Sequence, residues 1–435
     1  MSTRPLGACM STDREERLVA LRRELHRHPE PAWKEFRTTA RLVEELQRVG
    51  VDDYHVGREV LADERLSVPD ERDLEPWAER AREAGVDDDL LSEMAGGWTG
   101  CVAILEMGEG PTVGLRVDID GLPREESTDD GHFPAREGFR SETGAMHACG
   151  HDAHATIGVG VLEAVRDSDF SGTLKVFFQP AEEVIGGGKP MAESGHLDGV
   201  EYLYAVHVGL DYPTGEVVAG LDDILAVTQF YATFEGEPGH AGARPEEGRN
   251  AVQAMATAVS DLYGIPRHSD GASRVNAGRV GGGTASNIVP EEAFVHGEAR
   301  GETTEIRDFT FERARKVMEG AALSHDCSVD VDVEGEAPSA ESDEELIDVV
   351  HGAAADHPDV TDATRRGGLG GSEDATYLMQ HVQDDGGLAT YVGVGTDHPG
   401  GHHTATFDVA EGTLPIGVDV LTTAIRGTAR DLRER

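Results

Sequence analysis

The sequence predicts an α/β protein whose mostly parallel sheet is interrupted by an inserted α+β domain. Five apolar runs of five to seven residues are separated by stretches with helical periodicity, and the runs lie at residues 101–105, 113–117, 174–178, 202–208 and 388–394. Such short, continuous apolar runs are typical of parallel strands that are buried on both faces. Between residues 224 and 334 the order of the predicted strands and helices differs from that in the flanking sequence, which indicates an inserted domain.

The segment before the sheet is predicted to be helical. Residues 18–50 have the pattern of two amphipathic helices separated at His28-Pro29-Glu30-Pro31. Proline disfavours helix in the residue before it and is favoured at a helix start, so the helices divide there. Residues 52–98 are charged and helix-prone, and we expect them to form a surface insertion within the first domain.

The inserted region has its own order of elements. We expect strand 225–234, helix 250–263, strands 274–280 and 293–299, helix 309–323 and strand 329–333. This βαββαβ order is that of a ferredoxin-like α+β domain. We therefore predict a first domain of residues 1–223 and 335–435, and a satellite domain of residues 224–334 that serves as a lid or in dimerisation.

The chain is strongly acidic. It carries 83 acidic and 38 basic side chains, a formal net charge of −45. A field of this sign repels phosphate, which excludes a nucleic-acid or anionic-membrane binder that works through basic charge. Only four basic residues are lysine, namely Lys34, Lys175, Lys189 and Lys316. We expect a soluble protein adapted to a salt-rich cytoplasm, where salt screens the repulsion between carboxylates. An ordinary acidic cytosolic protein is the alternative.

The cysteine pattern indicates reduced thiols. No apolar leader stands at the start of the chain, and no apolar run approaches the roughly eighteen residues of a membrane span. The cysteines are scattered and are Cys9, Cys101, Cys149 and Cys327. We therefore expect a cytoplasmic protein in which a functional cysteine is reactive or binds a metal.

Metal-ligating residue types follow the predicted strands or stand at a helix entrance. In open α/β sheets, ligands bind beyond the carboxyl ends of the strands. The residues at these places are Asp118, Asp120, Cys149, His151, Glu182, Glu183, His207, His402 and His403. Cysteine, histidine and carboxylate side chains bind zinc or a borderline metal such as manganese. These segments together supply one cysteine, one metal-binding glutamate and three histidines as ligands. Five ligands are more than one structural zinc needs, so the pattern indicates two metals with a bridging group.

Each of these groups also has a simpler explanation when it is taken alone. The histidines could be hydrogen-bonded core residues or surface residues, and Glu182-Glu183 could be a solvated turn. Burying several histidines and carboxylates together without a metal is costly, and this favours the metal site. One of the two adjacent glutamates would then bind metal, and the other would be free to move a proton.

Eight motifs spread over nearly the whole chain carry a family resemblance: LRRELHRHPEPAWKEFRTTA, GLRVDIDGLP, MHACGHDAH, FFQPAEE, HAGARPEEGRNAV, GGGTASNIVP, GGSEDATYL and HHTATFD. In these motifs the chain resembles the co-catalytic two-metal amidohydrolases, which include aminoacylases, carboxypeptidase G and indole-acetyl-amino-acid hydrolases. Within the family it is most similar to the p-aminobenzoyl-glutamate hydrolase branch, because it carries the insertion GREVLADERLSVPDERDLEPWAERAREAG before GGWTG. The resemblance implies a zinc-peptidase-like catalytic domain as the first domain.

The resemblance also implies roles for single residues. It makes Cys149 the bridging thiolate, and the remaining ligands are His151, Glu183, His207 and His403. His403 and not His402 matches the ligand, because it stands four residues before Phe407. The resemblance makes Glu182 the general acid/base and Asp120 the carboxylate that orients a metal-site histidine. Where more distant members have a metal-binding histidine, this chain has Asp118. The implied cofactors are two divalent ions per chain, manganese or zinc.

Three residues of the satellite domain match substrate-binding positions of the family. His240 and Asn287 match residues that bind the scissile carbonyl or the substrate carboxylate, and Arg300 matches a carboxylate-binding position. From the residues alone, the favoured interpretation of His240 is a loop histidine in a glycine-rich turn, and Arg300 could equally be a surface pair at a strand end.

The resemblance predicts a metal-dependent amidohydrolase that acts on N-acyl or aroyl amino acids of the p-aminobenzoyl-glutamate kind. The alternatives are an aminoacylase, a hippurate or indole-acetyl-amino-acid hydrolase, and, in another class, a non-catalytic subunit of a hetero-oligomeric hydrolase. The expected partners are a small-molecule substrate and either a second copy of the chain or a related subunit. The sequence leaves open the acyl group, the metal and the oligomeric state.

Overall fold

The structure, a computed structural model, describes residues 10–398 and 400–431. These residues form two compact units. The first unit comprises the chain up to Asp223, the segment Ala340–Leu369 and the chain from Asp374 onward. The second comprises Ile224–Ser339 and Gly370–Glu373. The predicted boundary at residue 334 falls inside strand β12 (Ser328–Ala337), which continues to pair with its neighbour β7 (Ala226–Glu235) as far as the last residue of β12.

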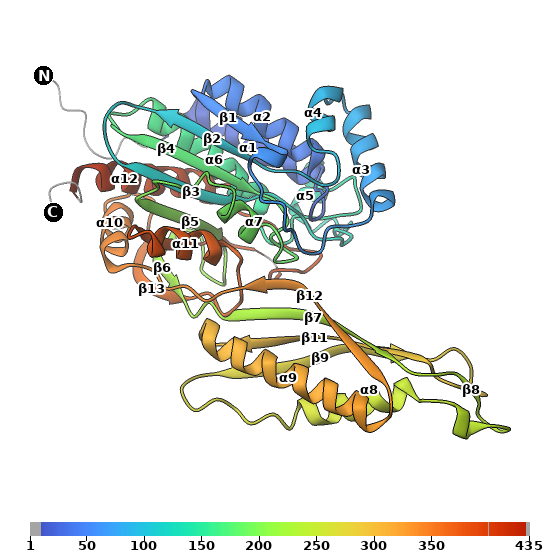
Figure 1. The fold of residues 1–435 in the computed structure, drawn as a ribbon. Helices are drawn as coiled ribbons and strands as arrows, with labels where there is room; N and C mark the ends of the chain where they lie inside the picture. The colour runs from blue at the N-terminus through green and yellow to red at the C-terminus, as the bar shows by residue number, and fades with distance from the viewer. Residues whose placement is uncertain (1–9, 399, 432–435) are drawn as a thin grey trace, which may run out of the picture. The chain divides into compact units, whose positions relative to one another are not determined.

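An eight-stranded sheet forms the centre of the first unit (Figure 1). Its order is β1-β2-β4-β3-β5-β14-β6-β13. The neighbours β4, β3, β5 and β14 run parallel, as do β6 and β13, whereas β1–β2, β2–β4 and β14–β6 are antiparallel. The strands are β1 (Asp53–Val56), β2 (Cys101–Glu106), β3 (Thr112–Asp118), β4 (Thr173–Gln179), β5 (Tyr202–Val208), β6 (Glu216–Asp222), β13 (Asp362–Gly368) and β14 (Leu388–Val394). The predicted mostly parallel sheet is confirmed.

Helices cover both faces of this sheet (Figure 1). Helix α6 packs on β3, β4 and β5 and against α1 and α12, and α11 packs on β5 and β14 and against α7. These helices are α1 (Thr12–Arg27), α6 (His151–Arg166), α7 (Gly188–Ala192), α11 (Ala375–Asp384) and α12 (Thr413–Asp431), and α10 (Glu344–Ala355) packs on β6 and β13. Glycine lets α6 approach α12, because a Cβ at Gly160 would lie 2.5 Å from the Val418 side chain. The buried α6 thereby brings its first turn to the carboxyl end of the sheet.

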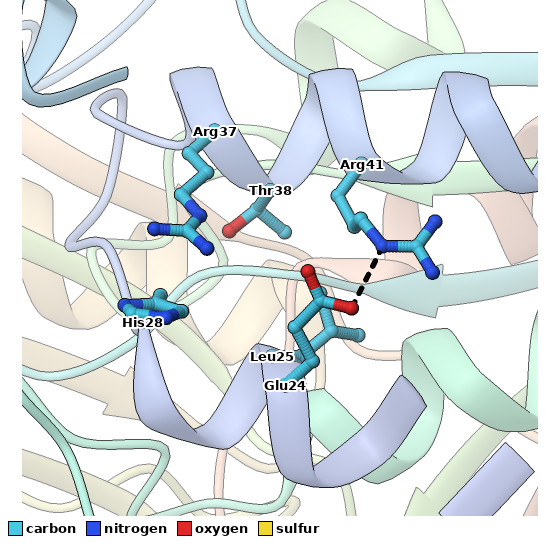
Figure 2. Close-up of a pocket in the computed structure, with 6 residues that line it drawn as sticks. All are labelled: Glu24, Leu25, His28, Arg37, Thr38 and Arg41. Carbon is cyan, nitrogen blue, oxygen red and sulfur yellow. Dashed lines mark hydrogen bonds and ion pairs between the residues drawn. The ribbon is translucent and has the colours of Figure 1, made fainter. Parts of the chain in front are cut away.

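The two predicted N-terminal helices are α1 and α2 (Phe36–Val49), and the proline-containing segment separates them. Helix α2 ends at Gly50, which adopts φ 72° and donates its backbone N–H to Leu46 O at 2.8 Å, the usual way to close a helix. Arg41 Nε donates to Glu24 Oε2 at 2.9 Å and ties α2 to α1 (Figure 2). The pocket drawn there has a volume of about 10 Å³, room for one water and not for a substrate.

The segment predicted as a surface insertion is anchored in the first unit. Its beginning forms β1, which pairs with β2 at the edge of the sheet. The helices α3 (Glu71–Glu83) and α4 (Asp88–Glu93) follow, and their apolar residues Leu74, Ala81 and Leu91 are buried. The segment is therefore charged outside but contributes both a strand and packed side chains.

The second unit is a four-stranded antiparallel sheet of order β12-β7-β11-β9 with two helices. Its elements are β7 (Ala226–Glu235), β8 (Gly239–His240), α8 (Ala251–Leu262), β9 (Ser273–Gly282), β10 (Ile288–Val289), β11 (Glu292–Gly301), α9 (Thr304–Ser324) and β12. Apart from the small β8–β10 ribbon, this is the predicted βαββαβ order. Alternate residues of β7, among them Phe230 and Phe234, are buried in a core with the inner faces of α8 and α9.

Two further sequence expectations concern membranes and thiols. Among the described helices, none combines the length and the apolar character that a membrane crossing requires. Cys101, Cys149 and Cys327 form no disulfide, and Cys9 lies outside the described residues.

Candidate metal centre

The predicted ligands of the first unit come together at the carboxyl end of its sheet. Strand β3 ends at Asp118, two residues before Asp120, and β4 ends three residues before Glu182. His207 is the penultimate residue of β5, and α6 begins at His151. The loop after β14 brings His403 to the segment before α6, where its backbone N–H donates to Ala148 O at 2.8 Å.

Cys149 stands at the centre of this arrangement. Its side chain belongs to two groups of potential ligand atoms that lie within 4.8 Å of one another: one with His151 and Glu183, the other with His207 and His402. The Cys149 Sγ lies 3.5 Å from His207 Nε2. The predicted ligand His403 lies on the Glu183 side, with its Nε2 3.4 Å from Glu183 Oε2.

Asp120 fixes the groups around it. Its Oδ1 accepts hydrogen bonds from His151 Nδ1 at 3.2 Å and from the backbone N–H of Glu182 at 3.1 Å, and its Oδ2 accepts from the backbone N–H of Glu183 at 3.0 Å. With Nδ1 donating to Asp120, the other ring nitrogen of His151 keeps its lone pair and can ligate. One buried carboxylate thus sets both the histidine and the turn that carries the two glutamates.

Their hydrogen bonds show that His207 can bind a metal, whereas His154 has a supporting role. His207 Nδ1 donates to Val208 O at 2.8 Å, which leaves Nε2 facing Cys149. His154 donates from Nδ1 to Asp118 Oδ1 at 2.6 Å and accepts the Val208 N–H on Nε2 at 2.8 Å. Both nitrogens of His154 are therefore used, and it cannot bind a metal without losing one of these bonds.

Both carboxylate oxygens of Asp118 also accept hydrogen bonds from neighbouring side chains. Its Oδ2 accepts from Arg116 Nη1 at 2.7 Å, while Oδ1 accepts from His154. Burial alone would raise the pKa of Asp118, but His151, His154 and Arg116 hold it well below the usual range. Asp118 is therefore a carboxylate held by a guanidinium and an imidazole, which suits a supporting residue.

The turn that presents the glutamates has an unusual backbone. Ala181 and Ile185 flank Glu182 and Glu183, and each adopts a positive φ, 54° and 53°, which is uncommon for residues other than glycine. Glu35 from the segment before α2 holds this turn, because its Oε1 accepts the Ala181 N–H at 2.8 Å. Such conformations persist where the surroundings enforce them, and they often occur at functional sites.

The donor set of this site fits a cation. His151 Nε2 is buried and has no hydrogen-bond partner among the described residues, and it lies 3.8 Å from Glu182 Oε2 and 3.9 Å from Glu183 Oε1. Burial opposes a charge on His151, but Asp118 and Asp120 raise its pKa to about 10. A field that stabilises a proton at this nitrogen also stabilises a metal ion there.

The second unit holds the three predicted substrate residues. His240 Nδ1 accepts the backbone N–H groups of Gly242 and Ala243 at 3.1 and 3.0 Å, so its Nε2 carries the proton and can donate. The β8–β10 pairing brings Asn287 beside this turn, since Asn287 O accepts the Ala241 N–H at 3.0 Å. Arg300 is differently placed: its Nε and Nη2 each donate to Glu298 at 3.0 Å.

Comparison with known proteins identifies the family. Residues 114–427 match the profile of peptidase family M20/M25/M40. The chain belongs to this family. It is 43% identical to the indole-3-acetyl-aspartic acid hydrolase of Enterobacter agglomerans and 40% identical to a p-aminobenzoyl-glutamate hydrolase subunit of Escherichia coli (strain K12). Both matches extend over 406 residues, 92% of this chain and 93% of each relative.

A solved structure extends the family likeness to the fold. The aminobenzoyl-glutamate utilization protein from Klebsiella pneumoniae superposes with a TM-score of 0.82 at 36% identity, over 96% of this chain and 98% of that one. The predicted family, fold class and enzyme class, a metal-dependent amidohydrolase, are confirmed.

Several residues that support the centre could not be predicted from the sequence. Glu35, Arg116 and the hydrogen-bonding state of His154 became evident only through tertiary contacts. One signal was present: Arg116 lies inside an apolar strand, where an arginine requires a buried carboxylate partner.

Proposed function

We propose that the chain hydrolyses the amide bond between an acyl or aroyl group and an amino acid, with p-aminobenzoyl-glutamate and related conjugates as substrates. The proposed cofactors are two divalent ions, manganese or zinc, and their ligands are Cys149, His151, Glu183, His207 and His403. The observation that carries the proposal is the membership of Cys149 in two ligand groups. A side chain shared by two ligand groups is suited to bridge two ions, and a thiolate can do this. The two relatives with 43% and 40% identity, named as hydrolases of an aspartic acid and a glutamate conjugate, support the substrate class.

In the proposed mechanism, Glu182 is the residue that transfers the proton from the water to the leaving amine. When bound, the metal ions supply an acidified water and polarise the amide carbonyl. Glu182 accepts the proton of the attacking water on its carboxylate and donates it to the departing amine nitrogen. Asp120 keeps the backbone of Glu182 in place through the 3.1 Å bond to its N–H. Of the three satellite-domain residues that the resemblance assigns to substrate binding, His240 has an Nε2–H that could donate to an oxyanion and Asn287 could bind a carboxylate, whereas Arg300 would first have to release Glu298.

Glu182→Gln tests the acid/base role. The amide has nearly the shape of the carboxylate but cannot shuttle the proton, so we expect turnover to fall by at least about 100-fold. Metal content and thermal stability are expected to stay those of the wild type. Retained turnover in a fully metal-loaded E182Q enzyme would refute the assignment.

A metal-resolved assay of the purified chain tests the function itself. The chain alone, loaded with Mn²⁺ or Zn²⁺, is assayed on aroyl-glutamates, hippurate and N-acetyl amino acids. Hydrolysis of aroyl-glutamates in preference to the others supports the proposal, while a preference for hippurate or N-acetyl amino acids supports the aminoacylase alternative. Since two relatives are named as one subunit of a hydrolase, activity that requires the addition of a second, related chain would show that this chain works in a heterodimer.

A further inference from the structure

The loop that follows Asp120 is fastened to the candidate metal centre at two points. Leu122 and Met146 exchange both backbone hydrogen bonds at 2.9 Å, close to Cys149 in sequence. Farther along, the Ser127 N–H donates to Ala405 O at 2.8 Å, two residues after His403. The loop therefore lies between the segment with the thiolate and the segment with the last histidine.

Arg124 lies in this loop, and its side chain is exposed. Its Nη1 donates to the backbone carbonyl of His403. The guanidinium therefore lies at the rim of the candidate centre, next to a proposed ligand.

The hydrogen-bond partner of Arg124 is a neutral carbonyl and not a carboxylate. No ion pair joins Arg124 to a carboxylate within the described part of the chain, although acidic side chains outnumber basic ones by 83 to 38. The guanidinium of Arg300, by contrast, already donates two hydrogen bonds to the Glu298 carboxylate. Of these two arginines, Arg124 is the one with N–H donors open to an added carboxylate.

A substrate with two carboxylates needs such a group. A chain with a net charge of −45 repels a dianion, so local positive charge must offset the repulsion. The side-chain carboxyl of an aspartyl or glutamyl leaving group is only a few bonds from the scissile nitrogen, and it therefore stays near the metal ligands during the reaction.

We propose that Arg124 is a specificity-determining residue that binds the side-chain carboxylate of an acidic leaving amino acid. This inference rests on the proposed function, because it assigns the amino-acid side of the hydrolysed amide. It makes N-acyl aspartate and glutamate the favoured substrates over their neutral amide counterparts.

A matched pair of substrates isolates this contact. N-benzoyl-glutamate and N-benzoyl-glutamine share the acyl group and the α-carboxylate and differ only in the side-chain carboxylate. We expect Arg124→Gln to lower kcat/KM for the glutamate substrate by about 10- to 100-fold, the usual range for losing one charge-assisted bond. The glutamine substrate is expected to change by less than about twofold, and Arg124→Lys to retain part of the preference.

The control is Arg430→Gln. Arg430 pairs with Asp169, which follows the far end of the 16-residue helix α6, about 24 Å from its first turn. This variant removes the same charge from the chain and is expected to keep the wild-type preference. Equal losses on both substrates in R124Q would mean that Arg124 only fastens the His403 loop, and would overturn the proposal.

Calorimetric binding of free L-glutamate and L-glutamine to the metal-loaded chain separates this proposal from the proposed function. Glutamate that binds the wild type at least about tenfold more tightly than it binds R124Q supports the role of Arg124, even if no amide is hydrolysed. Hydrolysis of neither substrate by the wild type would overturn the proposed function instead. Equal glutamate affinity in both proteins, or no glutamate binding at all, overturns the role of Arg124.

Discussion

The sulfur of Cys149 is the atom on which the proposed two-metal centre depends. Serine in its place keeps a similar size, but its hydroxyl is a poor ligand because it stays protonated at neutral pH. We therefore expect Cys149→Ser to weaken metal binding at least about tenfold, a loss typical of damaged metal sites. Metal per chain after dialysis against buffered Mn²⁺ or Zn²⁺ measures this.

A second cysteine supplies the control for that variant. Cys327 lies in the second unit, and Cys327→Ser should leave the metal content unchanged. Cobalt loading adds a spectroscopic test, since a sulfur-to-metal charge-transfer band should be present in the wild type and in C327S but absent from C149S. Full metal loading of C149S would refute the bridging role.

The residues that act as candidate ligands could be predicted from the sequence, whereas the side chains that hold these ligands in place could not. Glu182, Glu183 and His207 come directly from strand ends, and strand ends are visible as the last residues of apolar runs. Glu35 acts on a turn more than a hundred residues away, and only the folded chain reveals such a contact. The ion pair of Arg300 with Glu298 is the surface pair that the residues alone left open, since side chains two positions apart in a strand lie on the same face.

Among the elements, α1 and α6 are joined by a buried network of charges. His26 of α1 bonds through Nδ1 to Asp152 of α6 at 2.8 Å and through Nε2 to Glu126 at 2.9 Å. Arg22 Nε lies 2.8 Å from Asp152, and all four side chains are buried. Burial and Arg22 oppose a charge on His26, but the bonds to Asp152 and Glu126 raise its pKa to about 9.

This network makes the stability of the first unit depend on pH. Since the folded pKa of His26 lies above the unfolded value of about 6.5, its contribution is complete below pH 6.5 and is lost as the pH rises through 9. The free energy of unfolding should fall over this window by at most about 1.4 kcal/mol per pH unit from this residue. Denaturant titrations between pH 6 and pH 9.5 measure the slope.

Two variants show whether His26 is the source of that slope. His26→Gln should be less stable than the wild type at pH 6.5 by about 3 kcal/mol, because it removes the charged partner of two buried carboxylates. It should also lose part of the decline between pH 6.5 and pH 9. His296→Gln, which removes a half-exposed histidine of the second unit, should keep the wild-type slope. An unchanged slope in H26Q would contradict the network's role.

The elements differ in how well their sequences reveal them. The strands β3, β4, β5 and β14 are buried on both faces, so continuous apolar runs mark them. Strand β13, with the sequence DATRRGG, has no such run because it forms the exposed edge of the sheet. Strand β1 has no apolar run for the same reason, since it is the other edge of the sheet and only its last residue, Val56, is buried.

At the scale of the whole molecule, two opposing electrostatic effects follow from the composition. The excess of acidic side chains makes the folded chain repel itself, and salt reduces this repulsion. Many of the arginines form surface ion pairs, as Arg365 does with Glu344 and Asp348, and salt weakens those pairs. Exposed pairs contribute little individually, whereas the net charge of −45 acts over the whole surface, so we expect the first effect to dominate.

Stability should therefore rise with salt concentration. A screening gain of about 2 kcal/mol between 0.05 and about 1 M salt would raise the Tm of the first unit by roughly 4 °C, because the shift is about 2–4 °C per kcal/mol for domains of 150–250 residues and the first unit is larger. Thermal unfolding in NaCl, KCl and choline chloride measures this rise, and the three salts should act equally at equal ionic strength because screening does not depend on the identity of the ion. An exposed-surface variant that replaces several aspartates of the segment 52–98 by asparagine should need less salt for the same Tm. A Tm that falls with added salt would show instead that the arginine–carboxylate pairs of the surface determine the stability.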